Sequence, residues 1–387
     1  MRILHTSDWH LGHVLYNYDR TAEQQSMLNQ IIEIIKNEQP DAMVLSGDVY
    51  HTSQPSAAVQ TMFTEAIVAM HKACPTMTIV VTAGNHDSGS KHEIFQTPWR
   101  ALNVYALGNI DKEHPERHII EVPGKGIIVA VPYAYERLIP EGFFQQLLDL
   151  AAERNSADLP IVMMAHTTVS GCDFKGHDNA SERTVGGIDS MPHEAFGTGY
   201  DYLALGHIHH AQFIHGTEHR MRYSGTPLAV SFDEAYNHSV TMIEISKHGE
   251  APNVKEINVT NPHPLVTLPT TGTATWDEAK QLLKDFPDDM AAYIRLNVQV
   301  EDSLPTGAMD EARNIASGKQ CIVCHVNFTR PEQMRNKSRM LTVQELQDIP
   351  PLDLVKRYAS DNNEIFDQEM EDMFNEVVAI IQEEERK

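Results

Sequence analysis

The chain has 387 residues, and its 54 acidic residues outnumber 30 Lys and Arg to give a formal net charge of −24. This excess argues against a stand-alone nucleic-acid or anionic-membrane binder, because neither surface would attract the chain. Hydrophobic residues make up 41%, which is enough for a sizeable core. At about 150 residues per domain, the length predicts two or three domains.

The N-terminus and the cysteines favour the cytoplasm. No apolar run approaches the ~18 residues of a membrane span. Met1-Arg2 leads at once into the apolar Ile3-Leu4, which leaves no room for an export signal. The four cysteines do not make a disulfide framework. We therefore expect a soluble chain in a reducing compartment.

Through residue 262, short apolar runs alternate with helical patterns, as is typical of α/β folds. Helices are predicted over 21–37 and 57–71, each with one apolar face. The runs expected to be strands are 2–4, 42–45, 78–81, 127–131, 161–164 and 202–205. Several of them end directly in Asp, Asn or His, and ligands of open α/β sheets gather outside the carboxyl ends of strands.

The pattern changes after Pro262, and residues 263–330 predict a small β-α-β-α-β domain. Its first helix is expected to begin at Thr275, which has Glu278 in capping-box spacing. Cys321-Ile-Val-Cys324-His325 fits the pattern of a haem-attachment motif. That chemistry requires export and the motif falls on a predicted strand, so we interpret these cysteines as packed strand residues or as ligands of an adventitious metal ion.

Residues 331–387 are predicted to be a basic linker followed by a helical tail that starts at the capping box Thr342-Val-Gln-Glu345. Residues 361–387 hold ten acids and two bases, with apolar residues at helical spacing. An amphipathic acidic tail is a candidate partner-binding element. Alternatively, the two helices pack back on the body of the same chain.

The chain holds 21 histidines, and several gather with Asp and Asn where predicted strands end. The clusters are Asp8-Trp9-His10, Gly47-Asp48, Gly84-Asn85-His86-Asp87, His166 and Gly206-His207-Ile208-His209. In extended chain, i and i+2 side chains share one face, so Asp8 and His10, or His207 and His209, should reach a common centre. Each cluster alone is weak evidence, but their common position at strand ends predicts a metal site.

Carboxylate, imidazole and amide donors without a thiolate suit Mn²⁺, Fe²⁺ or Zn²⁺ rather than a calcium cage or a structural zinc site. The candidates exceed the needs of one tetrahedral ion, which favours two ions. A pair of ions ~3.5–4 Å apart needs a bridging carboxylate and activates water for attack on phosphate. Asp48 is the natural bridge because it stands alone after its strand.

These motifs resemble the signature of the calcineurin-like metallophosphoesterases over roughly residues 1–240. Within that superfamily, RILHTSDWHLG, GDVYHTSQPS, ALGHIHHAQ and YSGTPLAVSFDE resemble the SbcD family, the nuclease subunits of bacterial SbcCD complexes. The resemblance implies a two-sheet α/β sandwich flanked by helices over 1–262, a small α+β capping domain over 263–330, and a helix-loop-helix tail over 331–387.

The resemblance also implies roles for individual residues. One ion would be held by Asp8, His10, Asp48 and His209, and the other by Asp48, Asn85, His166 and His207. The preferred ion is Mn²⁺, with Mg²⁺, Fe²⁺ or Zn²⁺ as alternatives.

Beside the ligands, His86 would face the substrate, where an imidazole can stabilise charge or protonate the leaving oxygen. His51 matches a histidine near the scissile phosphate. Asp87 would orient His86 or cap the next segment. We expect His13 to be a surface loop residue, and His210 to point away from the site.

By resemblance, the function is DNA double-strand-break repair and recombination. The chain would act as an ATP-dependent 3′→5′ double-strand exonuclease and as a hairpin and single-strand endonuclease. An SbcC-type coiled-coil ATPase, bound through the C-terminal helices, would supply most of the affinity for DNA, because a chain with a net charge of −24 is expected to bind DNA weakly. A homodimer is also implied, through helices expected at 57–71 and 92–103.

Two alternatives remain open. A small-substrate phosphatase or phosphodiesterase shares the same metal chemistry, but it needs neither the tail nor the extra domain. A non-catalytic scaffold that tethers DNA ends would not need the full ligand set.

Overall fold

The computed structural model describes residues 1–94, 96–174, 190–300 and 305–330, together with single tail residues at 352, 355, 356, 370, 371, 373 and 374. The chain divides into two compact units, Met1–Val298 with Pro305–Asn327, and Gln299–Leu304 with Phe328–Lys387. Most of the second unit lies outside the described residues. So do the predicted linker, the capping box at Thr342 and most of the predicted tail helices.

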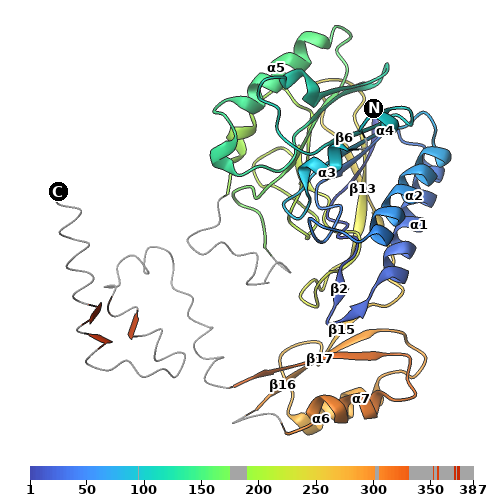
Figure 1. Cartoon of the computed structure of the whole chain (residues 1–387), viewed down its shortest axis with the longest axis vertical. Helices are drawn as coiled ribbons and strands as arrows, with labels where there is room; N and C mark the ends of the chain where they lie inside the picture. Colours follow the sequence, from blue (N-terminus) through green and yellow to red (C-terminus); the bar gives the residue numbers. More distant parts are fainter. Residues whose placement is uncertain are drawn as a thin grey trace. The chain divides into compact units, whose positions relative to one another are not determined.

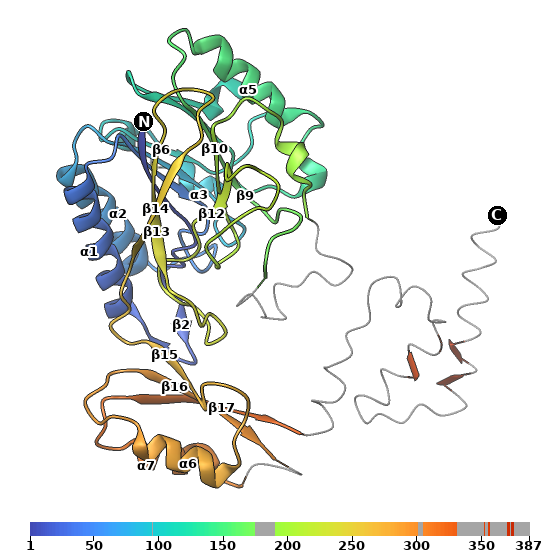
Figure 2. The same cartoon turned by 180° about the vertical axis from the view of Figure 1, so that it is seen from behind.

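Two six-stranded sheets stack face to face in the larger unit (Figures 1 and 2). The first has the order β14 (Asn253–Asn258), β13 (Ser239–Glu244), β1 (Arg2–Thr6), β4 (Ala42–Ser46), β5 (Thr78–Thr82) and β6 (Val104–Leu107). The second has the order β11 (Gln212–Phe213), β12 (Met221–Tyr223), β10 (Tyr202–Gly206), β9 (Ile161–His166), β8 (Gly126–Ala130) and β7 (Ile119–Val122). In the first sheet β1, β4, β5 and β6 are parallel, and antiparallel pairs add β13 and β14 at one edge. In the second sheet β12, β10, β9 and β8 are parallel, and β11 and β7 pair antiparallel at its two edges.

The central strands are apolar on both faces because each sheet is covered twice. On β1, Ile3 packs between the sheets with Val44 and Val162, whereas Leu4 packs outward with Met27. This outer layer consists of α1 (Thr21–Glu38) and α2 (Ala57–Ala73), which cover the first sheet (Figure 1). The outer face of the second sheet is covered by α5 (Phe143–Arg154).

The predicted α/β sandwich flanked by helices is confirmed, and the six expected strands are β1, β4, β5, β8, β9 and β10. The other strands of the two sheets were not predicted; they are β6, β7, β11, β12, β13 and β14. The helix expected over 92–103 is wrong, because two short helices, α3 (Gly89–Glu93) and α4 (Gln96–Arg100), lie there instead. Pro98 lacks an N–H and is tolerated only in the first turn of a helix, so a helix must restart just before it.

The remaining short elements connect these layers. They are the hairpin β2 (Val14–Leu15) and β3 (Tyr18–Asp19) and the 3₁₀ turns η1 (Pro115–His118), η2 (Glu136–Leu138) and η3 (His193–Phe196).

A separate three-stranded sheet follows, with the order β15 (Leu265–Leu268), β16 (Tyr293–Gln299) and β17 (Ile322–Thr329). Helices α6 (Trp276–Asp285) and α7 (Ala308–Ala316) lie together on it (Figure 1). The capping box of Thr275 and Glu278 is present in both directions. Cys321 and Cys324 are free and buried; Cys324 lies on β17 as expected, whereas Cys321 lies one residue before it. The element order matches the prediction, and the domain boundaries stay a prediction.

Within the described part of the chain, no helix combines the length and the apolar character needed to cross a membrane.

We predict that His5 makes the fold sensitive to acid. Burial, reinforced by the charge of Arg222, lowers the pKa of His5 from 6.5 to about 3. Between these pH values the unfolded chain binds a proton that the folded chain does not, so the free energy of unfolding falls as the pH falls. The contribution is on the order of a few kcal/mol.

The test replaces His5 together with Tyr202, whose hydroxyl lies 3.0 Å from His5 Nδ1. In urea denaturation from pH 7 to pH 4, the double variant His5→Phe/Tyr202→Phe should lose less stability than the unaltered chain. Parallel pH dependences would show that His5 does not contribute.

Candidate metal centre

The chain segments that end β1, β4, β5, β9 and β10 bring all the predicted metal residues together, most of them buried and Asn85 exposed. The carboxyl ends of parallel strands from both sheets meet there, as the sequence led us to expect. The loop after β1 lies against the loop after β4, because the N–H groups of Asp8 and His10 donate to the carbonyls of Gly47 (3.1 Å) and Asp48 (3.0 Å).

A first group consists of Asp8, His10 and His209, whose donor atoms lie within 4.8 Å of one another. The Nε2 atoms of His10 and His209 are 3.1 Å apart, and Asp48 Oδ2 is 3.8 Å from His10 Nε2. The carboxylate of Asp8 also accepts hydrogen bonds from the hydroxyl of Ser7 (2.5 Å) and the N–H of His207 (3.1 Å).

A second group surrounds His166. Its Nε2 lies 3.4 Å from Asp48 Oδ2 and 2.9 Å from Asn85 Oδ1, and Asn85 Oδ1 is 3.1 Å from His207 Nδ1. His166 Nδ1 donates to the carbonyl of Ser46 at 2.8 Å, so Nε2 is the nitrogen that faces the pocket. Asp48 therefore lies between the two groups, which is the place that a bridging ligand requires.

The backbone of the site differs from the extended geometry assumed for the i, i+2 pairs. Asp8 (φ 54°), His10 (44°), Asp48 (51°) and His207 (100°) all have positive φ, which is costly for residues with a Cβ. His207 and His209 consequently face different groups rather than one common centre. The candidate residues therefore lie together through turns with positive φ rather than through extended pairs.

Glycines make this close packing possible. A Cβ on Gly47 would overlap the ring of His166, one on Gly84 would overlap Asp48, and one on Gly206 would overlap the carbonyl of Ser46. The glycines that precede the predicted ligands are thus required by space and, at Gly47, also by a φ of 83°.

The electrostatics of the pocket are dominated by two buried carboxylates. Burial and the neighbouring Asp48 raise the pKa of Asp8, although nearby histidines oppose the shift. Burial also disfavours the charge on Asp48, but His166 and His10 outweigh it and hold the pKa of Asp48 well below its ordinary value. Burial likewise would lower the pKa of His166, yet Asp48 and Asp8 raise it to about 9.

These residues fit divalent cations. Two carboxylates, an amide oxygen and four imidazoles are the donor set of Mn²⁺, Fe²⁺ or Zn²⁺ sites. His10 Nδ1 is buried without a hydrogen-bond partner among the described residues, and burial lowers the pKa of His10 well below 6.5. A neutral imidazole is the form that binds a metal ion.

Two further histidines line the edge of this pocket. His86 Nδ1 lies 2.9 Å from the carbonyl of His51, to which it can only donate, and the rings of His86 and His51 stack with centroids 5.6 Å apart. Donor atoms of His10, His51 and His86 also lie within 4.8 Å of one another. Both histidines are half-buried and are brought to the metal residues as expected.

Asp87 does not orient the ring of His86. Its carboxylate accepts the N–H groups of Gly84 (2.9 Å), Val49 (3.1 Å) and Tyr50 (3.0 Å), so it ties the loop after β5 to the loop after β4. Neither of the two roles considered for Asp87 is observed, because the N–H groups that it binds precede it in the chain and do not belong to the next segment.

The expectation for His13 is wrong. Its ring packs edge-on against His51 with centroids 4.7 Å apart, and burial lowers its pKa to about 3. It is a half-buried neighbour of the site because the loop after β1 is hydrogen-bonded to the loop after β4 that carries His51. His210 packs on Tyr236 (4.5 Å between centroids) and lies 3.5 Å from Asp173, so it points away from the site as predicted.

Sequence reasoning missed Glu234, whose buried carboxylate lies 3.0 Å from Nδ1 of His209. A carboxylate that accepts this N–H fixes the tautomer and the aim of a metal-binding imidazole. The sequence feature that could have indicated Glu234 is the string SFDE at 231–234. It contributed to the family resemblance, but no role was predicted for its two acidic residues.

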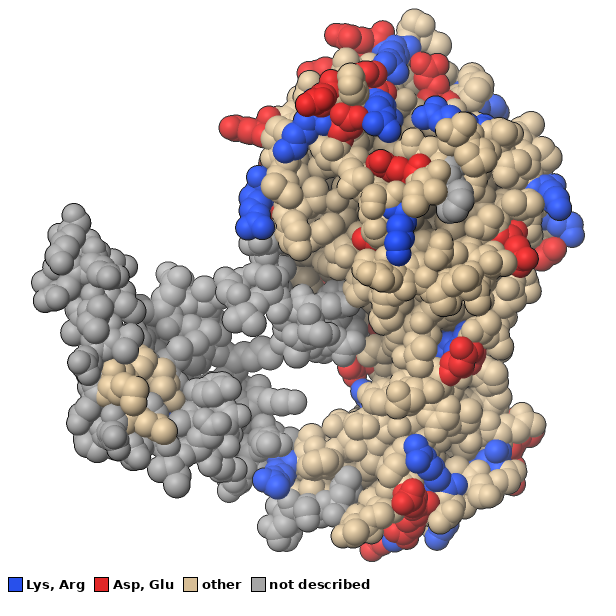
Figure 3. All heavy atoms as spheres, viewed as in Figure 1, with Lys and Arg blue, Asp and Glu red and all other residues tan. Residues whose placement is uncertain are grey.

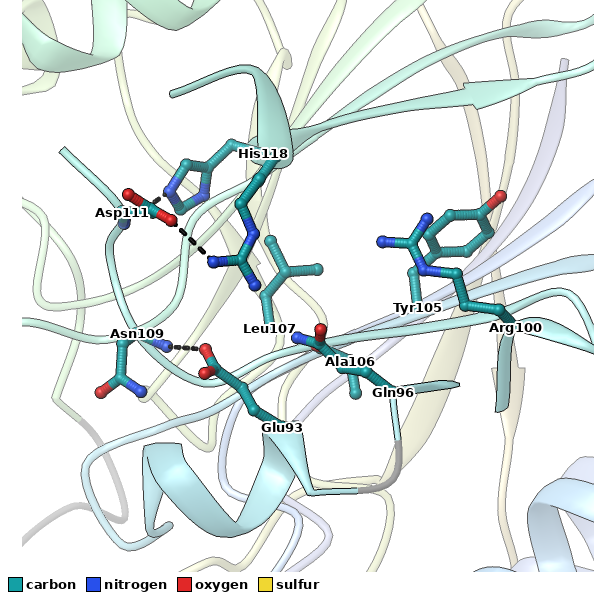
Figure 4. A pocket seen from close by; sticks show the side chains of 10 residues that line it. Glu93, Gln96, Arg100, Tyr105, Ala106, Leu107, Asn109, Asp111 and His118 are labelled. Carbon is teal, nitrogen blue, oxygen red and sulfur yellow. Dashed lines mark hydrogen bonds and ion pairs between the residues drawn. The ribbon is translucent and has the colours of Figure 1, made fainter. Parts of the chain in front are cut away.

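The pocket in Figure 4 is a different place in the fold. It lies beside β6, contains about 340 Å³ of empty space with open solvent included, and is lined by none of the predicted site residues. Arg117 pairs with Asp111 at 2.7 Å, Glu93 accepts the N–H of Asn109 at 3.1 Å, and Arg100 stacks on Tyr105. With these charged groups already engaged, we assign this pocket no role.

The sequence model of the family described as calcineurin-like phosphoesterase matches residues 1–211. This match covers the strands that carry the whole metal centre. The chain is therefore an enzyme of the metallophosphoesterase class.

Curated relatives align over much of the chain, and three of them are named as the SbcD component of the SbcCD nuclease. The protein of Bacillus subtilis (strain 168) is 30% identical with both chains fully covered. That of Rhodobacter capsulatus is 31% identical over 87% of this chain and 89% of its own length. That of Escherichia coli (strain K12) is 31% identical over 69% and 70%. The chain belongs to the SbcD family of calcineurin-like phosphoesterases, which supports a nuclease role.

We predict that Gly47→Ala disrupts metal binding, and Gly249→Ala provides a matched control. Both glycines have nearly the same positive φ (83° and 85°), but only at Gly47 would the added Cβ meet His166. Both variants should lose about 1 kcal/mol of stability from the backbone. Only Gly47→Ala should weaken Mn²⁺ binding, by tenfold or more in calorimetric titration. Equal affinities in the two variants would contradict this packing argument.

Proposed function

We propose that the chain is the nuclease subunit of an SbcCD-type complex and hydrolyses DNA phosphodiester bonds at a two-metal centre. The observation that carries the proposal is the pair of buried carboxylates, Asp8 and Asp48, with histidines on both sides and Asp48 between the two groups. The family and the names of the relatives support the nuclease activity.

In this proposal one ion is held by Asp8, His10, Asp48 and His209, and the other by Asp48, Asn85, His166 and His207. We propose Mn²⁺ as the native ion, since the donor set mixes oxygen and imidazole nitrogen. Bound there, the ions supply a water of lowered pKa and positive charge beside the scissile phosphate. Asn85 is the most exposed of these ligands, which suits a residue on the substrate side.

His86 is proposed to act on the substrate rather than on the ions. Its Nδ1–H donates to the carbonyl of His51, so Nε2 is the nitrogen that would face the reacting phosphate. A proton carried at Nε2 can stabilise the charge on the phosphate or pass to the leaving oxygen. His51, stacked on His86, would keep that ring in place and lie near the same phosphate.

The charge of the chain supports an additional subunit. The net charge is −24, and basic and acidic side chains are interspersed over the face shown in Figure 3 rather than separated by sign. Weak unaided DNA affinity is therefore expected, because duplex binding depends on Lys and Arg contacts to phosphates.

We propose that an SbcC-type coiled-coil ATPase supplies the missing DNA affinity. The same subunit would make the 3′→5′ exonuclease activity and the hairpin and single-strand endonuclease activity depend on ATP. The acidic tail would bind the ATPase, and two copies of this chain would form the centre of a heterotetramer. Such a complex would act on double-strand breaks in the cytoplasm.

His86→Ala should separate metal binding from catalysis. We expect hydrolysis of a labelled DNA hairpin in Mn²⁺ to fall by about 10² to 10⁴, the range for loss of a general acid, while Mn²⁺ affinity is retained. Asp48→Asn should lose both properties, and His210→Ala, which packs on Tyr236, should lose neither. A fully active His86→Ala or Asp48→Asn variant would refute the proposed mechanism.

Deletion of residues 340–387 should abolish complex formation with the ATPase but leave Mn²⁺-dependent hydrolysis of a small phosphodiester intact, because the metal residues all precede residue 210. Size-exclusion chromatography of the mixed subunits and a chromogenic phosphodiester assay measure the two properties. Simultaneous loss of both would contradict the division between tail and catalytic body.

A further inference from the structure

We propose that Arg295, on β16 of the small sheet, is a positioning residue for His209 and acts through Asp233 and Glu234. The inference rests on the proposed function, since it assigns His209 to the metal centre. It connects the small sheet to the ligands of one ion through side-chain contacts.

The contact nearest the metal centre is between Glu234 and His209. Glu234 Oε1 lies 3.0 Å from His209 Nδ1, and Oε2 accepts the N–H of Val230 at 3.3 Å. The side chain of Glu234 is fully buried. A carboxylate held in this way keeps the proton of His209 on Nδ1 and directs Nε2 toward His10.

Glu234 shares a tight turn with Asp233. The N–H of Asp233 donates to Ser231 Oγ at 3.2 Å, and the N–H of Glu234 donates to the carbonyl of Ser231 at 3.2 Å. The two carboxylates are adjacent on one short, hydrogen-bonded segment. A displacement of Asp233 is therefore transmitted to Glu234 and from there to the ring of His209.

Arg295 holds this turn from the small sheet. Its Nη1 donates to Asp233 Oδ1 at 2.8 Å, Nη2 to the carbonyl of Phe232 at 3.4 Å, and Nε to Thr267 Oγ1 on β15 at 3.2 Å. The guanidinium also lies 5.3 Å from the ring centroid of Phe232. Only 14% of the Arg295 side chain is exposed, and these contacts together hold the planar guanidinium in one orientation.

Apolar packing keeps the same turn against the small sheet. Phe232 forms a buried cluster with Leu15 of the β2–β3 hairpin and with Tyr293 and Cys324 of the small sheet. The aromatic ring fixes the position of the segment, and the ion pair with Arg295 fixes its rotation. The orientation of the His209 ring thus depends on the position of the small sheet.

The test is calorimetric Mn²⁺ titration of the full chain carrying Arg295→Ala, Asp233→Ala, or both changes. In each single variant we expect one of the two ions to bind about tenfold more weakly, at the lower end of the range for a lost partner of a metal-binding histidine, because Arg295 and Asp233 act on His209 through Glu234. The double variant should lose no more than either single variant, because both changes break the same connection. Arg295→Lys should lie between Arg295→Ala and the unaltered chain, since an ammonium keeps the charge but not the fork.

The matched control is Arg313→Ala, which replaces an exposed arginine on α7, a helix beside the small sheet. This variant should bind both ions as the unaltered chain does. Unchanged affinity for both ions in Arg295→Ala, or losses that multiply in the double variant, would overturn the inference. If Arg295→Ala fails to fold, Arg295→Lys and Asp233→Asn decide by the same criteria. If the unaltered chain binds fewer than two ions, the proposed function itself is wrong.

Discussion

Two carboxylates buried beside each other are the constraint on which the rest of the site depends. Asp8 and Asp48 follow the adjacent strands β1 and β4 and are 0% and 2% exposed. Burying one charge is costly, and burying two like charges together is more so, unless opposite charge compensates them. Without cations, a protonated His166 offers partial compensation, which is why the carboxylates raise its pKa to about 9. A pair of divalent cations compensates both charges, and neutral histidines can then complete their coordination.

The sandwich supplies the rigidity that this arrangement needs. Strands packed on both faces hold the turns after β1, β4 and β10 in left-handed backbone conformations. These conformations cost free energy, so they persist only where the surrounding structure stabilises them. Small residues at Gly47, Gly84 and Gly206 let the two sheets bring their ends into contact. The small sheet adds a further restraint through Arg295, so the metal centre depends on more of the chain than the strands that carry its ligands.

Local sequence was sufficient to find the central strands and the candidate ligands that gather at their ends, because apolar runs that end in Asp, Asn or His mark both the strand and the turn after it. It was insufficient where a long-range contact decides the outcome. Glu234 is 25 positions from His209 along the chain and is recognisable only once the turn at 231–234 is folded. His13 looked like a surface residue because nothing local shows that its loop folds back onto His51. The single helix expected over 92–103 is divided for a local reason, since Pro98 is tolerated only in the first turn of a helix.

Anomalous diffraction at the manganese edge, from crystals of the full chain grown in excess Mn²⁺, would locate the ions that Asp48 is proposed to bridge. We expect two manganese peaks about 3.5–4 Å apart, both within bonding distance of Asp48, with one beside His10 and His209 and the other beside His166 and Asn85. A single peak, or two peaks that do not share Asp48, would contradict the bridging role of Asp48.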